Sequence, residues 1–472
     1  MCQSKADGGR RCAGTPTGRA LSGLYLQRAA AVTPSEAEGF TKSIERLKAA
    51  EKFYGGRFVS PYTIPVPDGV SAALDTLESV GTPLIVGGAV RDSMSGSENK
   101  DIDIEVYGAD VDTIVAALRG GGFKVDEVGR AFGVLKVSKK GVVSDLDVSV
   151  PRRENTTGAG HRDFTVEPDS TMSVVDAAQR RDFTVNAVSY DPSREVLVDP
   201  FNGRKDFDDK VLRHVGDQFG EDPLRVLRGF QFAGRFGMSL DPSTAKLCRN
   251  LREHYRELPV ERVREEWGKF FTKSTSPATG VRALQEAGWD DTIHGLREAL
   301  KDVNTVDALD RLVKVPQGDR TVMGAAIIAA GMPSELRREF LSTVLIGKDD
   351  EKVAHDLASL NAADVDTSYA RRVLARKYAS RGFTFQRLAT FARDVTCDGV
   401  MGELADRAVE EGLGSGPEPD WIQGRDIIKT VSRKPGPWLG NLLDDVRDRQ
   451  YRREFANADE ALSWVIERAE SP

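Results

Sequence analysis

The sequence predicts an α+β fold in which a mixed sheet with helices is followed by an all-α region. Short apolar segments alternate with helical segments between Val70 and Val150, a pattern typical of α/β or α+β domains. From Asp222 onward nearly every segment has helical periodicity, and strand-like segments disappear. The chain of 472 residues is long enough for several domains. These three observations place an α+β domain first and a helical assembly after it.

Each element of the first half is bounded by local signals. Pro34 to Phe53 has helical spacing and is followed by glycines and prolines that interrupt it. Further helices are predicted at 70–77, from Gly88 onward and at 111–118. Strands are predicted at 83–86, 102–106, 124–127, 133–137 and 142–150. The last two are joined by a Lys-Lys-Gly turn and form a predicted hairpin.

The composition changes divide the chain into five predicted regions. They are a flexible leader at 1–33, an N-terminal helical extension at 34–66, an α+β domain at 67–215, and helical regions at 216–300 and 301–472. The leader has no apolar core and does not resemble a secretory signal. Its Cys2 and Cys12 lack a second pair of ligands, so a zinc site there is not favoured.

The charge and cysteine content limit the classes of function. There are 66 basic and 73 acidic residues, a net charge of −7, so any nucleic acid must bind a local basic surface. Four scattered cysteines are too few for a disulfide framework and fit a reducing cytoplasm. The longest uncharged, apolar-leaning stretch, 321–334, is shorter than the roughly 20 residues of a membrane span. We expect a cytoplasmic protein without a membrane segment.

The first candidate site is a Gly87-Gly88 turn followed by two acids on a predicted strand. A Gly-Gly turn that opens a helix lets backbone N–H groups approach a phosphate chain, although such turns are also common tight connections. Asp101 and Asp103 are two residues apart on a strand, so both carboxylates lie on one face. Carboxylates with substrate phosphates suit Mg²⁺. The alternative interpretation is a solvated strand face.

A third acid strengthens the metal interpretation. Asp147 alternates with the apolar Leu146 and Val148, so its strand can present it to the same metal ions, whereas Asp145 is interpreted as a surface residue. Two Mg²⁺ ions can activate a hydroxyl nucleophile and stabilise a departing pyrophosphate without a histidine base. The chain has only five histidines, which fits that chemistry.

Seven motifs in a fixed order carry a resemblance to a known family. Between Pro83 and Phe271 they are GGAVRD, DID, DVSVPRRE, RRDFTVNA, VDPFNGRKDF, EDPLRVLRGFQFAGRFG and ERVREEW. This stretch resembles the class II tRNA nucleotidyltransferase and bacterial poly(A) polymerase family. The resemblance implies a palm-type nucleotidyltransferase head followed by an all-α neck, body and tail. It also implies an enzyme that adds nucleotides (CCA) to tRNA 3′ ends without a template, with CTP and ATP as substrates and two Mg²⁺ ions as cofactors.

The resemblance also implies roles for individual residues. Asp101 and Asp103 would hold the metal ions, and Asp147 would be the third catalytic acid. The implied nucleotide-binding residues are Gly87, Gly88, Arg91, Arg181, Asp182, Asn186, Asp222, Arg225 and Arg228. Of these, the glycines and Arg91 would contact the triphosphate, and the residues of the RRDFTVNA motif would select NTP over dNTP. Asp199 and Gly203 match a hinge motif, and Glu261 and Arg262 match a helix that braces the neck.

Asp222 and Arg225 can also be interpreted from base chemistry alone. Cytosine and adenine each present an amino donor beside a ring-nitrogen acceptor, so one carboxylate and one guanidinium can read both bases. At positions i and i+3 of a helix the two side chains lie on one face. The alternative is that Glu221-Asp222-Pro223 is only a helix start.

A basic run in the second half is a candidate RNA-binding surface. The 17 residues from 371 to 387 contain no acid and have aromatic residues among their basic ones. Phosphate contacts come from Arg and Lys, so the run can contact tRNA, and a merely solvated basic helix is the alternative. The candidate RNA-binding residues are Arg371, Arg372, Arg376, Lys377 and Arg381.

Two rival functions remain open at this point. A poly(A) polymerase or A-adding RNA nucleotidyltransferase would use the same head, although residues 128–134 resemble the CCA-adding pattern more closely. A non-catalytic RNA-binding protein is disfavoured by the intact acids at 101, 103 and 147.

Two further segments carry weaker predictions. Residues 153–162 are predicted to be a flexible loop, and the resemblance implies that this loop is mobile. His355-Asp356 lacks the further ligands of a metal-dependent phosphohydrolase. The RNA substrate and the oligomeric state are not predicted.

Overall fold

The computed structural model describes residues 34–56, 58–96, 101–130, 133–156, 164–431 and 434–470. The predicted leader at 1–33, with Cys2 and Cys12, lies outside the described residues. The chain forms two compact units: unit 1 comprises 1–179 and 186–204, and unit 2 comprises 180–185 and 205–472. This division differs from the predicted boundary at 215: residues 180–185 and 205–215 belong to unit 2. The chain therefore passes between the two units more than once, which a single boundary in the sequence cannot describe.

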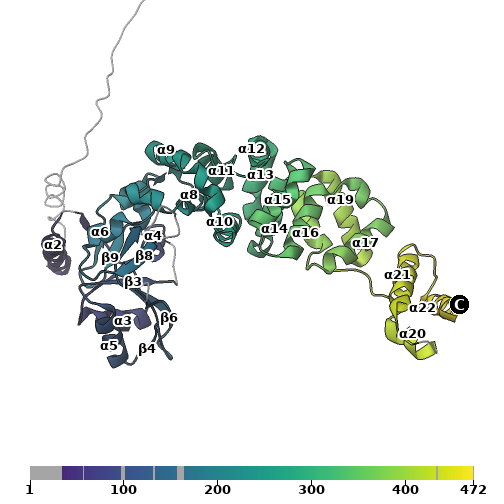
Figure 1. Ribbon diagram of the computed structural model, residues 1–472, viewed down its shortest axis with the longest axis horizontal. Helices are drawn as coiled ribbons and strands as arrows, with labels where there is room; N and C mark the ends of the chain where they lie inside the picture. The colour runs from purple at the N-terminus through teal and green to yellow at the C-terminus, as the bar shows by residue number, and fades with distance from the viewer. Residues whose placement is uncertain are drawn as a thin grey trace, which may run out of the picture. The chain divides into compact units, whose positions relative to one another are not determined.

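Unit 1 is built on an eight-stranded mixed sheet (Figure 1). The strand order is β1-β10-β9-β2-β3-β6-β5-β4, in which β3 and β6 pair parallel and the other neighbours pair antiparallel. The strands are β1 (Val59–Pro61), β2 (Thr82–Val86), β3 (Asp103–Tyr107), β4 (Lys124–Asp126), β5 (Val134–Lys139), β6 (Val143–Ser149), β9 (Ser189–Asp191) and β10 (Val196–Val198). The predicted N-terminal extension therefore contributes a strand, β1, to the sheet of the head.

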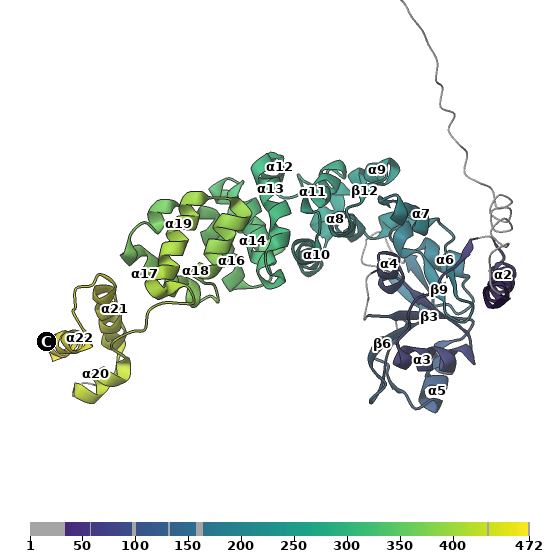
Figure 2. The ribbon, with the colours of Figure 1, turned by 180° about the vertical axis from the view of Figure 1, so that it is seen from behind.

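Helices α3 and α5 cover one face of this sheet (Figures 1 and 2). Leu77 of α3 and Leu118 of α5 belong to one buried apolar cluster with Ile104 and Val148 of the sheet. The strands place every second residue on this face, so the alternate residues of β3 and β6 lie on the opposite face. The helices of unit 1 are α2 (Pro34–Tyr54), α3 (Asp68–Glu78), α4 (Gly88–Met94), α5 (Val111–Gly120) and α6 (Val174–Gln179). Helix α7 (Gly203–Asp208) begins in unit 1 and continues into unit 2.

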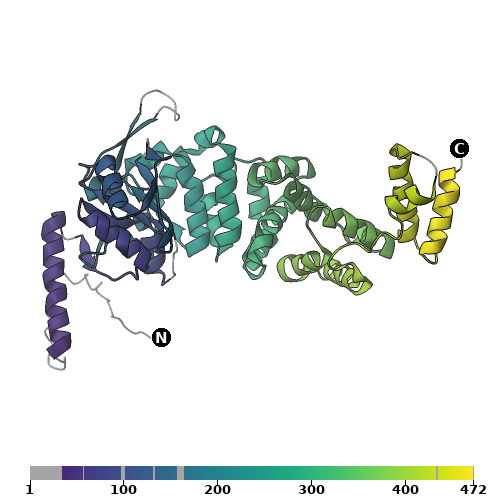
Figure 3. The ribbon, with the colours of Figure 1, turned by 90° about the horizontal axis from the view of Figure 1, so that it is seen from below.

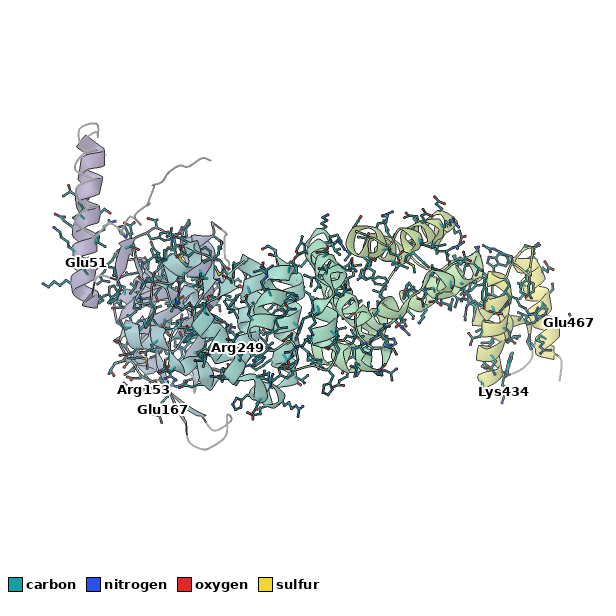
Figure 4. All side chains as sticks on the ribbon, turned by 90° about the horizontal axis from the view of Figure 1, so that it is seen from above. Glu51, Arg153, Glu167, Arg249, Lys434 and Glu467 are labelled. Carbon is teal, nitrogen blue, oxygen red and sulfur yellow. The ribbon has the colours of Figure 1, made fainter. Side chains whose placement is uncertain are left out.

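A separate two-stranded sheet replaces part of the predicted loop. Strands β7 (Arg152–Thr156) and β8 (Phe164–Pro168) pair antiparallel, with Arg153 opposite Glu167 (Figure 4). The prediction of a loop is therefore wrong for Arg153 to Thr156, because these residues pair with Phe164 to Glu167 and cross-strand pairing supplies backbone hydrogen bonds. The remainder of the predicted loop, 157–162, lies outside the described residues.

Unit 2 is predominantly helical, as predicted. Its first core is aromatic: the ring centroids of Phe230 and Phe270 are 4.1 Å apart, and those of Phe230 and Trp267 are 4.8 Å apart. One exception to the all-α prediction is a short parallel pair between β11 (Val211–Leu212) and β12 (Ser239–Leu240). The first helices of unit 2 are α8 (Leu224–Phe236), α9 (Pro242–Asn250), α10 (Val260–Lys273) and α11 (Pro277–Glu286), shown in Figure 2, and α8 and α10 supply these three rings.

The remaining helices of unit 2 follow in sequence order. They are α12 (Leu296–Lys301), α13 (Val303–Arg311), α14 (Gln317–Ala330), α15 (Ser334–Val344), α16 (Lys348–Ser359), α17 (Ser368–Ala379), α18 (Phe385–Thr390), α19 (Gly399–Ala408), α20 (Gly424–Thr430), α21 (Pro437–Tyr451) and α22 (Ala458–Glu470). The last three pack around a core of their own that includes Ile427, Val446 and Val465 (Figure 3). None of the described helices is long and apolar enough to cross a membrane.

Candidate active site

The predicted site residues fall into two sets, one in each unit. Unit 1 holds Gly87, Gly88, Arg91, Asp101, Asp103, Asp147 and Asn186. Unit 2 holds Arg181, Asp182, Asp222, Arg225 and Arg228, together with the basic run of α17.

Asp101 and Asp103 are on one face of the chain at the start of β3, as predicted. Both are exposed, whereas Ile102 and Ile104 are buried in the core beneath the sheet. This alternation is the period-two pattern of a strand, although β3 itself begins only at Asp103. The two carboxylates therefore face away from the apolar cluster.

Asp147 is the immediate neighbour of Asp103 across the sheet. In the parallel pairing of β3 and β6 the two residues are in register, which places their backbones about 4.8 Å apart, the usual spacing of paired strands. The sheet thus brings together three predicted acids from two segments of the chain. We call Asp101, Asp103 and Asp147 the carboxylate face.

Lys136 extends this row by one strand, and the sequence reasoning did not identify it. In the antiparallel pairing of β5 and β6, Lys136 is opposite Asp147. Its Nζ lies 2.6 Å from Oδ1 of Asp147 and 3.8 Å from Oδ1 of Asp145. The hydrogen bond with Asp147 raises the pKa of the Lys136 ammonium, and the charges of Asp147, Asp145 and Asp103 act in the same direction. The position of Lys136 between the buried Leu135 and Val137 could have revealed its orientation.

The chemistry of the carboxylate face fits a magnesium site. Among the described residues, no group of three His, Cys, Asp or Glu side chains is arranged so that it could hold a metal ion by itself. Mg²⁺ does not need such a cage, since it is commonly bound by one or two carboxylates together with substrate phosphates. Asp147 already has a cation, the Lys136 ammonium, at hydrogen-bonding distance. Carboxylates are hard oxygen ligands, and Asp101 and Asp103 are exposed while Asp147 is partly exposed, so the three residues fit a magnesium site.

The Gly87-Gly88 turn leads directly into α4. Gly87 has φ 70° and ψ −131°, a conformation that residues with a side chain rarely adopt, and its carbonyl accepts a hydrogen bond from the Arg91 N–H. The glycine at this position is thus required by the backbone, which agrees with the turn predicted from the sequence.

Arg91 is buried inside unit 1. Its Nε and Nη2 donate to Oδ1 of Asp92 at 2.9 and 2.7 Å, and its Nη1 donates to Oδ1 of Asn186 at 2.7 Å. All three side chains belong to residues that are only 5% exposed. A buried charge has to be paired and hydrogen bonded, and Asp92 and Asn186 meet this requirement for Arg91. The guanidinium in turn fixes the orientation of the Asn186 amide. Its predicted contact with a triphosphate stays a prediction.

In unit 2, Asp182 and Arg228 form one pair. Asp182 is buried, its Oδ1 accepts a hydrogen bond from the Phe183 N–H at 2.8 Å, and its Oδ2 accepts one from Nε of Arg228 at 2.7 Å. The two residues come from motifs 46 positions apart. Arg181, which precedes Asp182, is partly exposed.

Asp222 and Arg225 are not side by side on a helix, so that part of the prediction is wrong. Asp222 has an extended backbone and precedes α8; its Oδ1 accepts from the Leu224 N–H at 3.1 Å, as the helix-start alternative requires. Its Oδ2 accepts from Nη2 of Arg262 at 2.8 Å, a contact that the sequence reasoning missed. Pro223 follows Asp222 and marks the start of the helix, which excludes Asp222 from the helical face.

Arg225 is held by the backbone. Its Nη1 donates to the carbonyl of Gln218 at 2.6 Å, and its Nη2 donates to the carbonyl of Arg180 at 2.9 Å. The guanidinium is therefore fixed in orientation by two segments that flank it.

The basic run on α17 does not form the exposed surface that was predicted. Arg371 and Arg372 are only 6% and 7% exposed. Arg371 donates to both carboxylate oxygens of Glu411, and Arg372 donates from Nε to Glu418 at 3.1 Å. The prediction of an exposed basic surface is wrong for these two residues, because the acids that pair with them come from distant positions in the sequence.

The other basic residues of the run are paired and partly exposed. Nη1 of Arg376 lies 2.7 Å from Asp420, and Nζ of Lys377 lies 2.8 Å from Asp356. Asp356 also accepts from Arg381 at 2.5 Å. Each of these residues therefore has a carboxylate partner within unit 2.

Two family models match this chain. Residues 84–213 match the model described as the Poly A polymerase head domain. Residues 237–290 match the model described as the probable RNA and SrmB-binding site of polymerase A. The resemblance identified from the motifs is confirmed over these residues, which include all the predicted site residues of unit 1 and, from unit 2, Arg181 and Asp182.

Curated relatives are similar to this chain over about half of its length. The chain is 36% identical over 227 residues to the Multifunctional CCA protein of Xylella fastidiosa (strain M23), covering 47% of this chain and 50% of the relative. It is 36% identical over 238 residues to the Multifunctional CCA protein of Stenotrophomonas maltophilia (strain R551-3), covering 49% and 53%. The chain thus spans about half the length of the curated relatives it matches.

Solved structures share the fold over most of the chain. The Bacillus stearothermophilus CCA-adding enzyme in complex with CTP aligns with a TM-score of 0.64 at 22% identity, covering 86% of this chain and 98% of that one. The Thermotoga maritima CCA-adding enzyme complexed with tRNA_CCA aligns with a TM-score of 0.53 at 18% identity, covering 85% and 95%. The class that these comparisons define is a chain with a poly A polymerase head domain at residues 84–213, followed by helical domains. Within that class, the fold is the one seen in CCA-adding enzymes.

Proposed function

We propose that this protein is a Mg²⁺-dependent RNA nucleotidyltransferase that adds CCA to tRNA 3′ ends from CTP and ATP without a nucleic acid template. The observation that carries the proposal is the carboxylate face, in which Asp103 and Asp147 are in register on neighbouring strands. These acids lie within residues 84–213, the part of the chain that matches a nucleotidyltransferase head. Relatives named Multifunctional CCA protein support the choice of substrate.

The residues of unit 1 would serve the phosphates and the attacking hydroxyl. Asp101 and Asp103, with Asp147 beside them, would hold two Mg²⁺ ions, which when bound would activate the RNA 3′-hydroxyl and stabilise the departing pyrophosphate. The Gly87-Gly88 turn leaves the backbone free of side chains where a triphosphate would approach. Arg91 would act indirectly, because its guanidinium positions the Asn186 amide.

The residues of unit 2 would serve base recognition. Asp222 can accept a hydrogen bond from the amino group of cytosine or adenine, and Arg225 can donate to the adjacent ring nitrogen. Arginine has five N–H donors, so the two carbonyls that bind Arg225 fix its plane and leave further donors for a base. Arg262 would hold the Asp222 carboxylate in place. Guanine and uracil present donor and acceptor in the reverse order and would be rejected.

Helical parts of unit 2 would bind the RNA. Residues 237–290 match a probable RNA-binding model, and Arg376, Lys377 and Arg381 on or after α17 remain candidates for phosphate contacts because they are partly exposed. Arg371 and Arg372 would support this surface from the interior. The few scattered cysteines fit the reducing cytoplasm, where tRNA is processed.

A nucleotide incorporation assay tests the proposal. Purified full-length protein is incubated with a tRNA transcript that lacks CCA, labelled CTP and ATP, and Mg²⁺. We expect incorporation of three nucleotides, which stops when EDTA is added. Asp103→Asn is the matched control, since it keeps the size of the side chain and removes the charge. Absence of incorporation with every RNA would overturn the proposal in favour of a non-catalytic RNA-binding protein.

A second candidate function is polyadenylation. The matched head model is described for poly A polymerase, so the head by itself is compatible with either activity. Long A tails on an RNA primer with ATP alone would favour this second function. A product that stops after three nucleotides would favour CCA addition.

A further inference from the structure

Lys136 is the cation nearest to the predicted third acid, and no role has been given to it above. It lies on β5 directly opposite Asp147, with its Nζ 2.6 Å from Oδ1 of that carboxylate. Asp145 is 3.8 Å away on the same face of β6. The ion pair is partly exposed: 54% of the Lys136 side chain and 35% of the Asp147 side chain are accessible to solvent, whereas Oδ1 of Asp147 is itself buried.

An exposed pair of this kind contributes little to folding stability, since solvent screens both charges. Its position is more informative than its strength. Asp103, Asp147 and Lys136 occupy consecutive strands in register, and Asp126 of β4 is opposite Lys136 on its other side. The lysine ammonium therefore lies within a row of acids, and Asp147 is the one that its Nζ contacts at 2.6 Å. A lysine is a compact point charge on a flexible stem and can release its partner without any change in the backbone.

We propose that Lys136 is the built-in counter-ion of the carboxylate face: it holds Asp147 when no divalent cation is bound and competes with that cation for the carboxylate. Lys136 is thus a positioning residue that acts through Asp147. The inference rests on the proposed function in one respect only, the binding of a divalent cation by the carboxylate face. In addition, Lys136 lowers the affinity of the carboxylate face for a divalent cation without being one of its ligands.

Removal of the Lys136 charge should raise the affinity of the carboxylate face for a divalent cation. A positive charge close to a cation site always disfavours the cation, and at separations of a few ångströms the repulsion is large enough to matter even in water. Lys136→Met should therefore tighten divalent cation binding by roughly 5- to 10-fold at moderate ionic strength. Lys136→Arg, which keeps the charge, should bind the cation about as well as the wild type.

Calorimetric titration of the full-length, metal-free protein with Mn²⁺ in the absence of nucleotide tests the inference. Lys140→Met is the matched control, because Lys140 is an exposed lysine at the turn of the same hairpin. Its Mn²⁺ affinity should equal that of the wild type. Circular dichroism and thermal unfolding of each variant establish that the fold is retained, and Lys136→Gln replaces Lys136→Met if that variant does not fold.

The outcomes separate this inference from the proposed function. Unchanged or weaker Mn²⁺ binding by Lys136→Met overturns the inference, as does the absence of Mn²⁺ binding by the wild type. If the wild type incorporates nucleotides but the affinity does not shift, the function stands and the inference fails. If the affinity shifts in Lys136→Met alone but no RNA is extended, the inference stands and the proposed function fails.

Discussion

The carboxylate face of unit 1 and the basic helix α17 of unit 2 are both clusters of like charge in the sequence, yet they differ in burial and in ion pairing. Asp101 and Asp103 stay exposed on one face of a strand, with Asp147 in register beside them. Arg371 and Arg372 are buried and paired with carboxylates 40 and 46 residues away. Asp101 and Asp103 lie at the surface, whereas Arg371 and Arg372 join α17 to other segments of unit 2 through ion pairs.

The difference shows when a cluster of like charges in a sequence predicts an exposed ligand-binding site. Strand periodicity alone fixes the direction of a side chain, so an alternation of acid and apolar residues is a reliable guide. The surroundings of a helical arginine depend on segments that its own sequence does not contain. The residues Arg225 and Arg228 are intermediate: they lie in a predicted site but are bound by backbone carbonyls and by Asp182.

The largest expected effect is on the carboxylate face. Asp101→Ala or Asp103→Ala should reduce nucleotide incorporation by about 1,000-fold or more, because a lost metal ligand costs several kcal/mol of transition-state stabilisation. Thermal unfolding should change little, since both residues are exposed. Asp145→Ala, an exposed acid on β6, serves as the control and should stay active. Near-wild-type turnover in Asp101→Ala or Asp103→Ala would contradict the metal-binding role of the carboxylate face, and with it the contrast to α17.

A smaller effect is expected at Arg225. Arg225→Ala should lower the preference for C and A over U and G by roughly 5- to 150-fold, since one base-edge pairing is worth about 1 to 3 kcal/mol. The relative kcat/KM values for the four NTPs measure this preference. Arg225→Lys keeps the charge but loses the planar fork and should recover it only in part. Selectivity equal to that of the wild type would leave Asp222 as a helix start and Arg225 as a structural residue.

The buried arginines should affect stability more than RNA binding. Arg371→Ala removes the partner of Glu411 and two backbone carbonyls, those of residues 365 and 366. Breaking a buried pair in this way should lower the free energy of unfolding by about 2 to 3 kcal/mol, at the low end because Glu411 is partly exposed. Urea denaturation measures the loss. An unchanged stability together with weakened RNA binding would restore the surface interpretation.

The smallest effect is a pH dependence at the same pair. The hydrogen bond from Arg371 lowers the pKa of the Glu411 carboxyl below its ordinary value of 4.5. A depressed pKa in the folded state means that the contribution to stability is present above pH 4.5 and is lost as the pH falls through the folded value. The difference in unfolding free energy between wild type and Glu411→Gln should therefore shrink below pH 4.5. A constant difference down to pH 3 would contradict this account.

Much of unit 1 could be predicted because its elements follow simple periods. The strand that carries Asp103, the helix after Gly88 and the helix from Val111 lie within one or two residues of their predicted bounds. The short strands β1, β9 and β10 were not predicted, since three residues are too few to show a period. The hairpin at 152–168 was missed because its pairing, not its composition, defines it.

The positions of the candidate acids on their strands follow from the sequence better than their contacts do. Asp147 was predicted from alternation, and the register confirms its place beside Asp103. The contacts of Lys136 with Asp147 and of Arg262 with Asp222 depend on tertiary pairing, which one sequence does not reveal. The same limit explains Arg371 and Arg372, whose acidic partners lie outside the basic run.

One experiment tests the central claim most directly. Three tRNA transcripts, ending before the CCA sequence, after its first C and after its second C, are each incubated with purified protein, Mg²⁺ and a single NTP. The account predicts that the first two accept C, that the third accepts A, and that none accepts U or G. Extension of all three transcripts by ATP alone, or extension of none by any NTP, would contradict it.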